Sequence, residues 1–131
     1  MRILIVEDDF VSRRILLRIL GCHGETDVAV DGREACAAFE LALDEGRPYD
    51  LAVLDIMMPN MDGREALARM REIESARGID GLARAKIIMA TALSDSKNIL
   101  GSFFEGGCDG YVVKPYDREK IEAQMEKLGL I

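Results

Sequence analysis

The run at residues 51–63, which reads Leu-Ala-Val-Leu-Asp-Ile-Met-Met-Pro-Asn-Met-Asp-Gly, constrains the fold more than any other stretch of the chain. Four apolar residues lead without alternation into Asp55, and Pro59 ends the run. A short, continuous apolar run is typical of a strand buried on both faces of a parallel sheet. Asp62 is then a candidate N-cap for a helix that begins at Gly63. Asp55 is therefore expected at the carboxyl end of the strand, where open α/β sheets place ligand sites. On this stretch alone, a carboxylate that only caps a nearby amide remains an open alternative.

The composition fits one folded domain over residues 1–131. Apolar residues make up 49% of the chain, which excludes a disordered protein and suffices for a core. The formal net charge of −7 argues against a nucleic-acid-binding surface, which needs a basic patch. The three cysteines have no paired spacing and are expected to be reduced, mostly buried thiols. With no leader and no apolar run that could span a bilayer, we expect a cytoplasmic protein with no membrane partner.

Predicted strands and helices alternate along the whole chain. The predicted strands are residues 2–6, 25–30, 51–55, 86–90 and 110–113, and the predicted helices are residues 10–22, 33–45, 63–77, 95–105 and a last helix capped by Asp117. Strict alternation at these lengths predicts an α/β fold, in which a parallel five-stranded sheet has helices on both faces and right-handed crossovers.

The first predicted helix carries apolar residues at helical spacing, with arginines between them. The apolar residues expected to face the core are Val11, Ile15, Leu16, Ile19 and Leu20. His23, the only histidine, follows in a turn and is expected to be an ordinary surface residue.

Polar residues with matching chemistry follow several of the predicted strands. Glu7 and Asp8 follow the first strand, and Thr91 and Lys114 end or follow two later ones. Because the carboxyl ends of parallel strands open on one edge of the sheet, these residues are expected to converge with Asp55. Three carboxylates would repel one another unless a hard divalent cation such as Mg²⁺ offsets them. A lysine and a hydroxyl beside such a cluster indicate a visiting phosphoryl group, and a carboxylate can itself become an acyl phosphate.

Together these motifs resemble the CheY-like response regulator receiver domain over essentially the full chain. The matching residues are Glu7-Asp8, Asp55 with Pro59 and Asp62-Gly63, Thr91-Ala92, Tyr111 and Lys114-Pro115. The resemblance implies a flavodoxin-like, three-layer (βα)5 fold with strand order 2-1-3-4-5. It also implies a signalling switch that catalyses only its own phosphorylation and dephosphorylation, and is not otherwise an enzyme.

The resemblance implies a role for each matching residue. Asp55 would be the phosphoacceptor, and Asp8, Asp55 and the backbone carbonyl of Met57 would ligate Mg²⁺, with Glu7 acting partly through water. Lys114 would contact the phosphoryl oxygens, and the Lys114–Pro115 peptide would be cis.

Two further residues would pass the event to a surface. Thr91 would hydrogen-bond the phosphoryl group, and Tyr111 would change rotamer. The signal would reach the surface made by the fourth helix, fifth strand and fifth helix, whose helix at residues 95–105 contains Gly101 and is expected to be marginal. Met57 and Leu93 are apolar at positions that help to govern the hydrolytic water in the family, so we predict slow autodephosphorylation.

The implied partners are a histidine kinase or histidine phosphotransfer protein, and a downstream protein target that the sequence does not name. With no output domain after Ile131, a stand-alone receiver or one cut from a larger chain is expected. Three alternatives stay open: a receiver-like module that never uses its phosphosite, a small haloacid dehalogenase-type phosphatase and a flavodoxin. The phosphatase wants an acid where Met57 stands, and the acids at Glu7 and Asp8 would repel the phosphate of a flavin.

Overall fold

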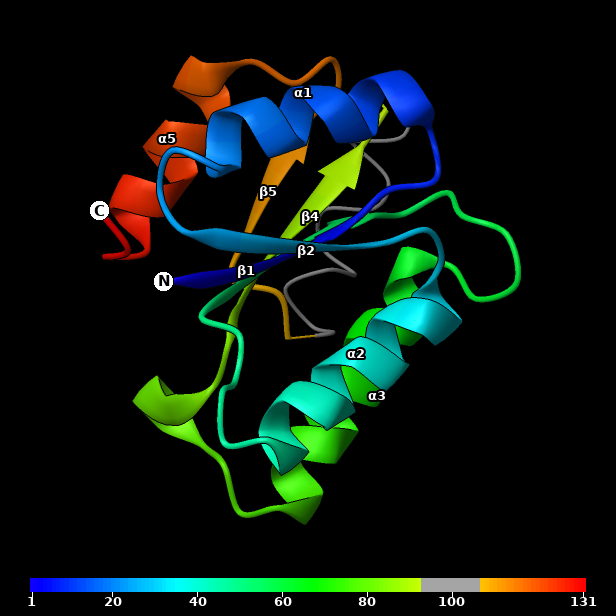
Figure 1. The fold of residues 1–131 in the computed structure, drawn as a ribbon, viewed down its shortest axis with the longest axis vertical. Helices are drawn as coiled ribbons and strands as arrows, with labels where there is room; N and C mark the ends of the chain where they lie inside the picture. The colour runs from blue at the N-terminus through cyan, green and yellow to red at the C-terminus, as the bar shows by residue number, and fades with distance from the viewer. Residues whose placement is uncertain (93–106) are drawn as a thin grey trace.

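The computed structural model describes residues 1–92 and 107–131. Their five strands form one parallel sheet in the order β2-β1-β3-β4-β5, which confirms the predicted fold class and topology (Figure 1). The strands are β1 (Arg2–Val6), β2 (Glu25–Ala29), β3 (Leu51–Asp55), β4 (Lys86–Thr91) and β5 (Gly110–Val113), and the helices are α1 (Phe10–Leu20), α2 (Gly32–Asp44), α3 (Gly63–Ala76), the 3₁₀ turn η1 (Gly81–Ala83) and α5 (Arg118–Lys127). The helix predicted at residues 95–105 lies outside the described residues.

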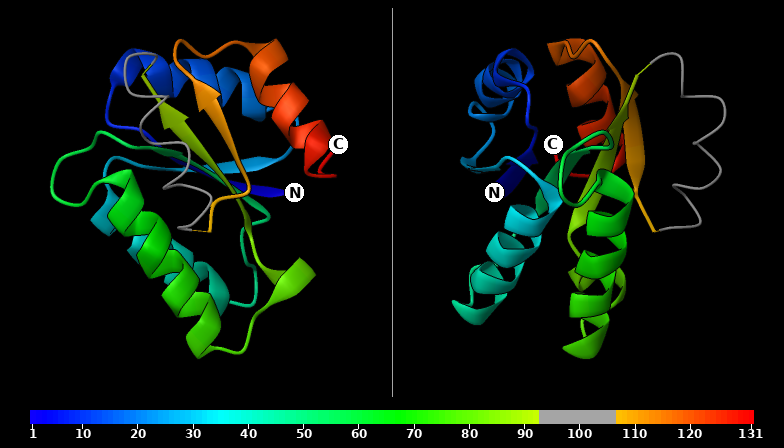
Figure 2. Two further views of the ribbon diagram at one scale, coloured as in Figure 1. Left: turned by 180° about the vertical axis from the view of Figure 1, so that it is seen from behind. Right: turned by 90° about the vertical axis from the view of Figure 1, so that its right-hand side faces the viewer.

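The sheet is the middle of three layers. Helices α1 and α5 cover one face and α2 and α3 cover the other (Figures 1 and 2). Alternate residues of one strand therefore enter different cores: on β1, Leu4 and Val6 pack with α2 and α3, while Ile3 and Ile5 pack with α1 and α5. The central strand β3 is buried at every position, as its unbroken apolar run predicts.

An aspartate immediately precedes each α-helix in the described part of the chain. Asp9, Asp31, Asp62 and Asp117 each accept a hydrogen bond from a backbone N–H in the first turn of the helix that follows. Such caps satisfy donors that have no partner inside the helix. They fix the point at which the chain leaves each strand end and turns into a helix.

Two predictions about α1 and the turn after it were wrong. Val11 and Ile15 do not face the core but are 63% and 37% exposed, whereas Leu16, Ile19 and Leu20 are buried and Leu17 packs partly against the same core. His23 is not an ordinary surface residue, since its Nε2 lies 2.6 Å from Oε2 of Glu122 on α5. The hydrogen bond from His23 lowers the pKa of Glu122.

The structure also tests the predicted end of the second strand and the state of the cysteines. Val30 lies beyond the end of β2 and is 40% exposed. All three cysteines are free, with Cys36 and Cys108 buried and Cys22 exposed. Across residues 1–92 and 107–131, no helix combines the length and the apolar character needed to cross a membrane.

Candidate functional site

The polar residues singled out in the sequence come together at the carboxyl edge of the sheet. Backbone hydrogen bonds bring the strand ends side by side: Ile56 N–H donates to Ala90 O at 3.1 Å, and Lys114 N–H donates to Thr91 O at 2.8 Å. The residues that leave this edge therefore come from neighbouring strands. Glu7 and Asp8 follow β1, Asp55 ends β3, Thr91 ends β4 and Lys114 follows β5.

Three carboxylates and one ammonium group form the centre of the site. Carboxylate oxygens of Glu7, Asp8 and Asp55 lie within 4.8 Å of one another. Lys114 Nζ lies 3.0 Å from Glu7 Oε1 and 3.0 Å from Asp55 Oδ2, so one lysine joins two of the acids. Glu7 is fully buried and Asp55 is 4% exposed, while Asp8 is exposed to solvent.

Burial and repulsion shift the ionisation of this cluster. Burial raises the pKa of Glu7, and the neighbouring Asp55 raises it further against the opposing effect of Lys114. Burial alone would lower the pKa of Lys114, but its hydrogen bonds to Glu7 and Asp55 outweigh that cost and the pKa is raised. Lys114 is therefore held as a cation between two acids.

The donor set fits a hard divalent cation. One lysine offsets only one of the three formal negative charges, and the acids supply the oxygen ligands that Mg²⁺ prefers. Asp8 provides the solvent-exposed side of the cluster, so an ion that keeps several waters can be accommodated there.

The loop after β3 is shaped around Asp55. The backbone N–H of Met57 donates to Asp55 Oδ1 at 3.3 Å, while the Met57 side chain is 71% exposed. Gly63 N–H donates to Ile56 O at 2.9 Å, and a Cβ on Gly63 would lie 2.4 Å from Asp55 O. The Asp62-Gly63 sequence therefore serves two structural needs: Asp62 caps α3, and only glycine at position 63 lets that helix approach the strand end so closely.

The other predicted residues occupy the expected positions. Thr91 is buried at the end of β4 and its hydroxyl donates to Ala92 O at 3.2 Å. Tyr111 lies on β5 and is partly buried. The Lys114–Pro115 peptide is cis, which confirms the sequence expectation. Leu93 lies outside the described residues.

Sequence reasoning missed Tyr116. Its hydroxyl donates to Glu7 Oε1 at 3.0 Å, and its ring centroid lies 5.6 Å from Lys114 Nζ. The phenol is buried and its pKa is raised by that burial and by the negative charge of Glu7. The only available signal was a tyrosine two residues after a predicted site lysine, which by itself is equally typical of core packing.

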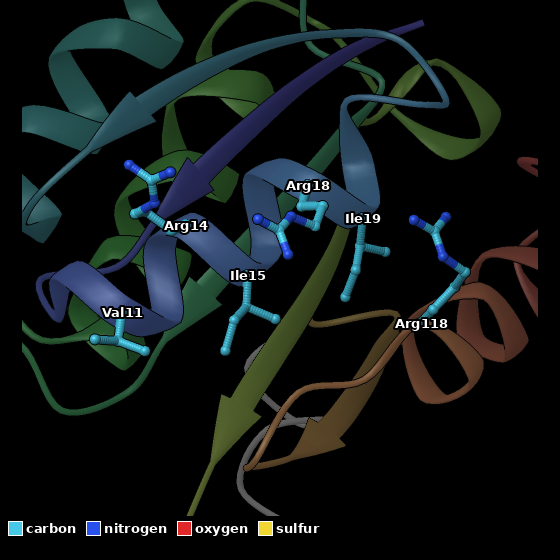
Figure 3. Close-up of a pocket in the computed structure, with 6 residues that line it drawn as sticks. All are labelled: Val11, Arg14, Ile15, Arg18, Ile19 and Arg118. Atoms are coloured by element: carbon cyan, nitrogen blue, oxygen red, sulfur yellow. The ribbon is translucent and has the colours of Figure 1, made fainter.

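A groove lies between α1 and α5. It has a volume of about 440 Å³, and Val11, Ile15 and Ile19 lie in one row along α1 with Arg118 opposite on α5 (Figure 3). Arg14 and Arg18 complete its lining. Helix α1 follows the acid cluster directly along the chain, with Asp9 as its N-cap and Phe10 60% exposed.

The family model for the response regulator receiver domain matches residues 3–126. The chain belongs to this family. Receiver domains are the signalling switches of two-component systems, and the fold and the strand-end acids described above are those of a receiver domain.

Individual relatives agree with this assignment. The transcriptional regulatory protein TcrA of Mycobacterium tuberculosis is 33% identical over 129 residues, which cover 98% of this chain and 46% of the relative. The two-component response regulator ORR41 of Oryza sativa subsp. japonica is 30% identical over 98% of this chain and 94% of its own length. The chain thus spans less than half the length of TcrA and nearly all of ORR41.

The fold has solved counterparts. A chain from the crystal structure of the CheX–CheY–BeF3–Mg²⁺ complex of Borrelia burgdorferi superposes with a TM-score of 0.83 at 27% identity, over 98% of this chain and 89% of that chain. The CheY-like receiver domain protein of Methanospirillum hungatei JF-1 gives a TM-score of 0.72 at 27% identity, over 97% and 91% of the two chains.

Proposed function

We propose that residues 1–131 form a single receiver domain that works as a phosphorylation-dependent switch, with Asp55 as the phosphoacceptor. The observation that carries this proposal is the grouping of Glu7, Asp8 and Asp55 around Lys114 at the carboxyl edge of the sheet. The donor would be a phosphohistidine on a histidine kinase or a histidine phosphotransfer protein. A stretch similar to this chain also occurs in the probable histidine kinase 2 of Oryza sativa subsp. japonica, which is 35% identical over 131 residues.

The transfer is a substitution at phosphorus. A carboxylate oxygen of Asp55 attacks the phosphorus, the phosphorus–nitrogen bond breaks, and the leaving imidazole keeps the electron pair and takes up a proton from solvent. The product is an acyl phosphate, which water later hydrolyses back to the carboxylate and inorganic phosphate. The chain is thus both reactant and catalyst, and it turns over no separate substrate.

The side chains around Asp55 divide the work by charge. Lys114 Nζ already lies 3.0 Å from Asp55 Oδ2, so its positive charge would stabilise the phosphoryl oxygens bound to Asp55. Thr91 would donate its hydroxyl to the same group. Glu7, Asp8, Asp55 and the carbonyl of Met57 would hold Mg²⁺, which when bound supplies positive charge against the phosphoryl oxygens. The similar chain from Borrelia burgdorferi was crystallised in a complex that contains both BeF3 and Mg²⁺.

Phosphorylation would be read at a surface away from Asp55. The added charge would draw Thr91 towards the phosphoryl group, and Tyr111 would change rotamer in response. The proposed readout surface comprises the fourth helix of the sequence prediction, β5 and α5, where an unidentified downstream protein would dock. The exposed Met57 side chain, with Leu93, would disfavour a positioned water at Asp55, so we propose slow autodephosphorylation.

The phosphodonor would dock along α1. Phe10 and Val11 are exposed directly after the acid cluster, and, within residues 1–92 and 107–131, Arg14 and Arg18 have no carboxylate partner. Although the chain as a whole is net negative, this patch is apolar and basic, so it would complement an amphipathic helix whose polar face carries acidic residues. The variant Arg14→Glu/Arg18→Glu should slow transfer from a phosphorylated donor protein at least tenfold and leave phosphorylation by acetyl phosphate unchanged.

The decisive experiment measures intact mass after incubation with acetyl phosphate and Mg²⁺. A gain of one phosphoryl group that requires Mg²⁺ and is absent in Asp55→Asn is expected. No gain in folded protein, with acetyl phosphate and with a phosphorylated histidine phosphotransfer protein, would favour a binding module that does not use its phosphosite.

A further inference from the structure

We infer that Tyr116 is a positioning residue for the metal site, and that its hydroxyl holds the Glu7 carboxylate in place for cation binding. This inference rests on the proposed Mg²⁺ role of Glu7, but it concerns a residue that the proposed chemistry does not use. Tyr116 would touch neither the metal nor the phosphoryl group and would act only through Glu7.

The contacts of Glu7 leave it little freedom. Its Oε1 receives two donors, the hydroxyl of Tyr116 at 3.0 Å and Nζ of Lys114 at 3.0 Å, while its Oε2 accepts from the backbone N–H of Asp9 at 3.3 Å. Glu7 is fully buried and Tyr116 is 7% exposed, so no bulk water replaces these donors. The tyrosine hydroxyl therefore sets which oxygen of Glu7 turns towards Lys114 and which turns towards Asp9.

A neutral donor suits this position better than a second cation. The phenol satisfies a buried carboxylate without cancelling its charge, so the cluster keeps the negative charge that attracts a divalent ion. Lys114 is shared with Asp55, at 3.0 Å, and would also serve an incoming phosphoryl group. When Lys114 turns to that group, Tyr116 is the donor that keeps Glu7 Oε1 from being buried without a partner.

The reach of this contact depends on the length of the side chain at position 7. Glutamate is one methylene longer than aspartate. An aspartate carboxylate at this position would be drawn back by one carbon–carbon bond, about 1.5 Å, and would therefore lie too far for a hydrogen bond with the Tyr116 hydroxyl, which is 3.0 Å from Glu7 Oε1. The pair of Glu7 and Tyr116 should thus behave as a unit, whereas Asp at position 7 should be indifferent to the hydroxyl.

Calorimetric titration with Mg²⁺ alone, in the absence of any phosphodonor, tests whether Glu7 and Tyr116 act together in cation binding. Tyr116→Phe keeps the buried ring and removes only the hydroxyl, and it should weaken Mg²⁺ affinity about tenfold, at the lower end of the effect of outer-shell partners. In a Glu7→Asp background the same substitution should change the affinity less than twofold. Thermal unfolding of each variant without Mg²⁺ establishes that it is folded.

Tyr49→Phe is the matched control. The Tyr49 hydroxyl donates to Asp27 Oδ2 at 2.6 Å, so the variant loses the same kind of contact, tyrosine to carboxylate, at a place remote from the acid cluster. It should leave Mg²⁺ affinity unchanged. Equal loss of affinity from Tyr116→Phe in the Glu7 and Asp backgrounds, or no loss in either, would overturn the inference. No Mg²⁺ binding by the unmodified chain would instead refute the metal part of the proposed function.

Discussion

Two clusters of buried charge lie at opposite ends of the sheet, and they differ in how far the protein's own donors satisfy their acids. At the carboxyl edge, Glu7 and Asp55 share Lys114, with Asp8 exposed beside them. At the other end, Arg71 of α3 joins Glu74 Oε1 at 2.7 Å and Asp109 Oδ2 at 2.8 Å. Both clusters set one cation against more than one acid, so the count of charges does not separate them.

The backbone separates them. At the Arg71 cluster, Glu74 Oε2 accepts from Ala85 N–H at 2.8 Å and Asp109 Oδ2 accepts from Ile87 N–H at 2.9 Å. Arg71 donates in turn to the carbonyls of Ala85 and Gly107, at 2.9 Å each. The backbone amides thus compensate the second acid, and the cluster ties α3 to the amino ends of β4 and β5.

At the carboxyl edge, the backbone offers far less. Asp55 Oδ1 and Glu7 Oε2 each accept one long amide contact of 3.3 Å, and Asp8 keeps an exposed carboxylate next to both. The comparison teaches that burial of charge does not by itself identify a binding site. The negative charge that is left after the protein's own donors are counted is what distinguishes the proposed ion site from the Arg71 cluster.

Removal of the cation from the self-satisfied cluster should have the largest effect. Arg71→Met leaves the buried Glu74 and the partly buried Asp109 without their cation, and we expect the free energy of unfolding to fall by about 3–5 kcal/mol. Urea unfolding measures this. Arg69→Met on the same helix, where the arginine is 54% exposed, should cost less than about 0.5 kcal/mol. Equal effects of the two variants would show that the Arg71 cluster is not structural.

The Cys36 thiol on α2 provides a third case of a buried ionisable group. Burial raises the pKa of the Cys36 thiol from 9.0 to about 11. The folded state therefore keeps a proton that the unfolded state releases, so this stability is present below pH 9 and is lost as the pH rises through about 11. We expect a loss of about 2–3 kcal/mol over that range.

The measurement is the free energy of unfolding at several pH values between 8 and 11. Cys36→Ala should have a shallower dependence than the unmodified chain, whereas Cys22→Ala, at an exposed cysteine, should keep the original slope. Parallel slopes for all three proteins would contradict the assignment.

Mg²⁺ should act on the carboxyl-edge cluster alone. At ten times its dissociation constant, the ion should raise the free energy of unfolding by about 1.4 kcal/mol, because it binds only the folded state. Chelation should remove the increment, and Asp8→Asn should abolish it. Asp109→Asn, a matched change in the Arg71 cluster, should keep it, which a thermal melt with and without Mg²⁺ can check. An increment that survives Asp8→Asn would place the ion elsewhere.

The smallest effect should also be the most discriminating, because its sign differs between the clusters. Without Mg²⁺, Asp55→Asn removes repulsion from Glu7 and Asp8 at the cost of one contact with Lys114, and should stabilise the fold by about 1 kcal/mol. Asp109→Asn should instead destabilise it, because the lost ion pair with Arg71 outweighs the relief of repulsion from Glu74, which Arg71 and the Ala85 N–H already compensate. Thermal melts that shift in the same direction for both variants would refute the distinction.

The sequence alone determined the alternation of strands and helices, the strand-end positions of Asp55, Thr91 and Lys114, and the caps Asp62 and Asp117. These depend on local pattern: an apolar run, a helical period, or an aspartate before a helix. Strand order and the roles of the site residues followed from the family resemblance, and the structure confirms the order but leaves the roles as proposals.

Only the tertiary structure decided which polar residues satisfy one another. Tyr116 meets Glu7 across 109 positions of the chain, His23 meets Glu122 across 99, and Arg71 meets Asp109 across 38. No sequence period or spacing predicts any of these pairs. The exposure of Val11 and Ile15 also depends on the tertiary structure, because α5 leaves this part of α1 open. An apolar stripe predicts which side of a helix can be buried, but not how much of that side a neighbour covers.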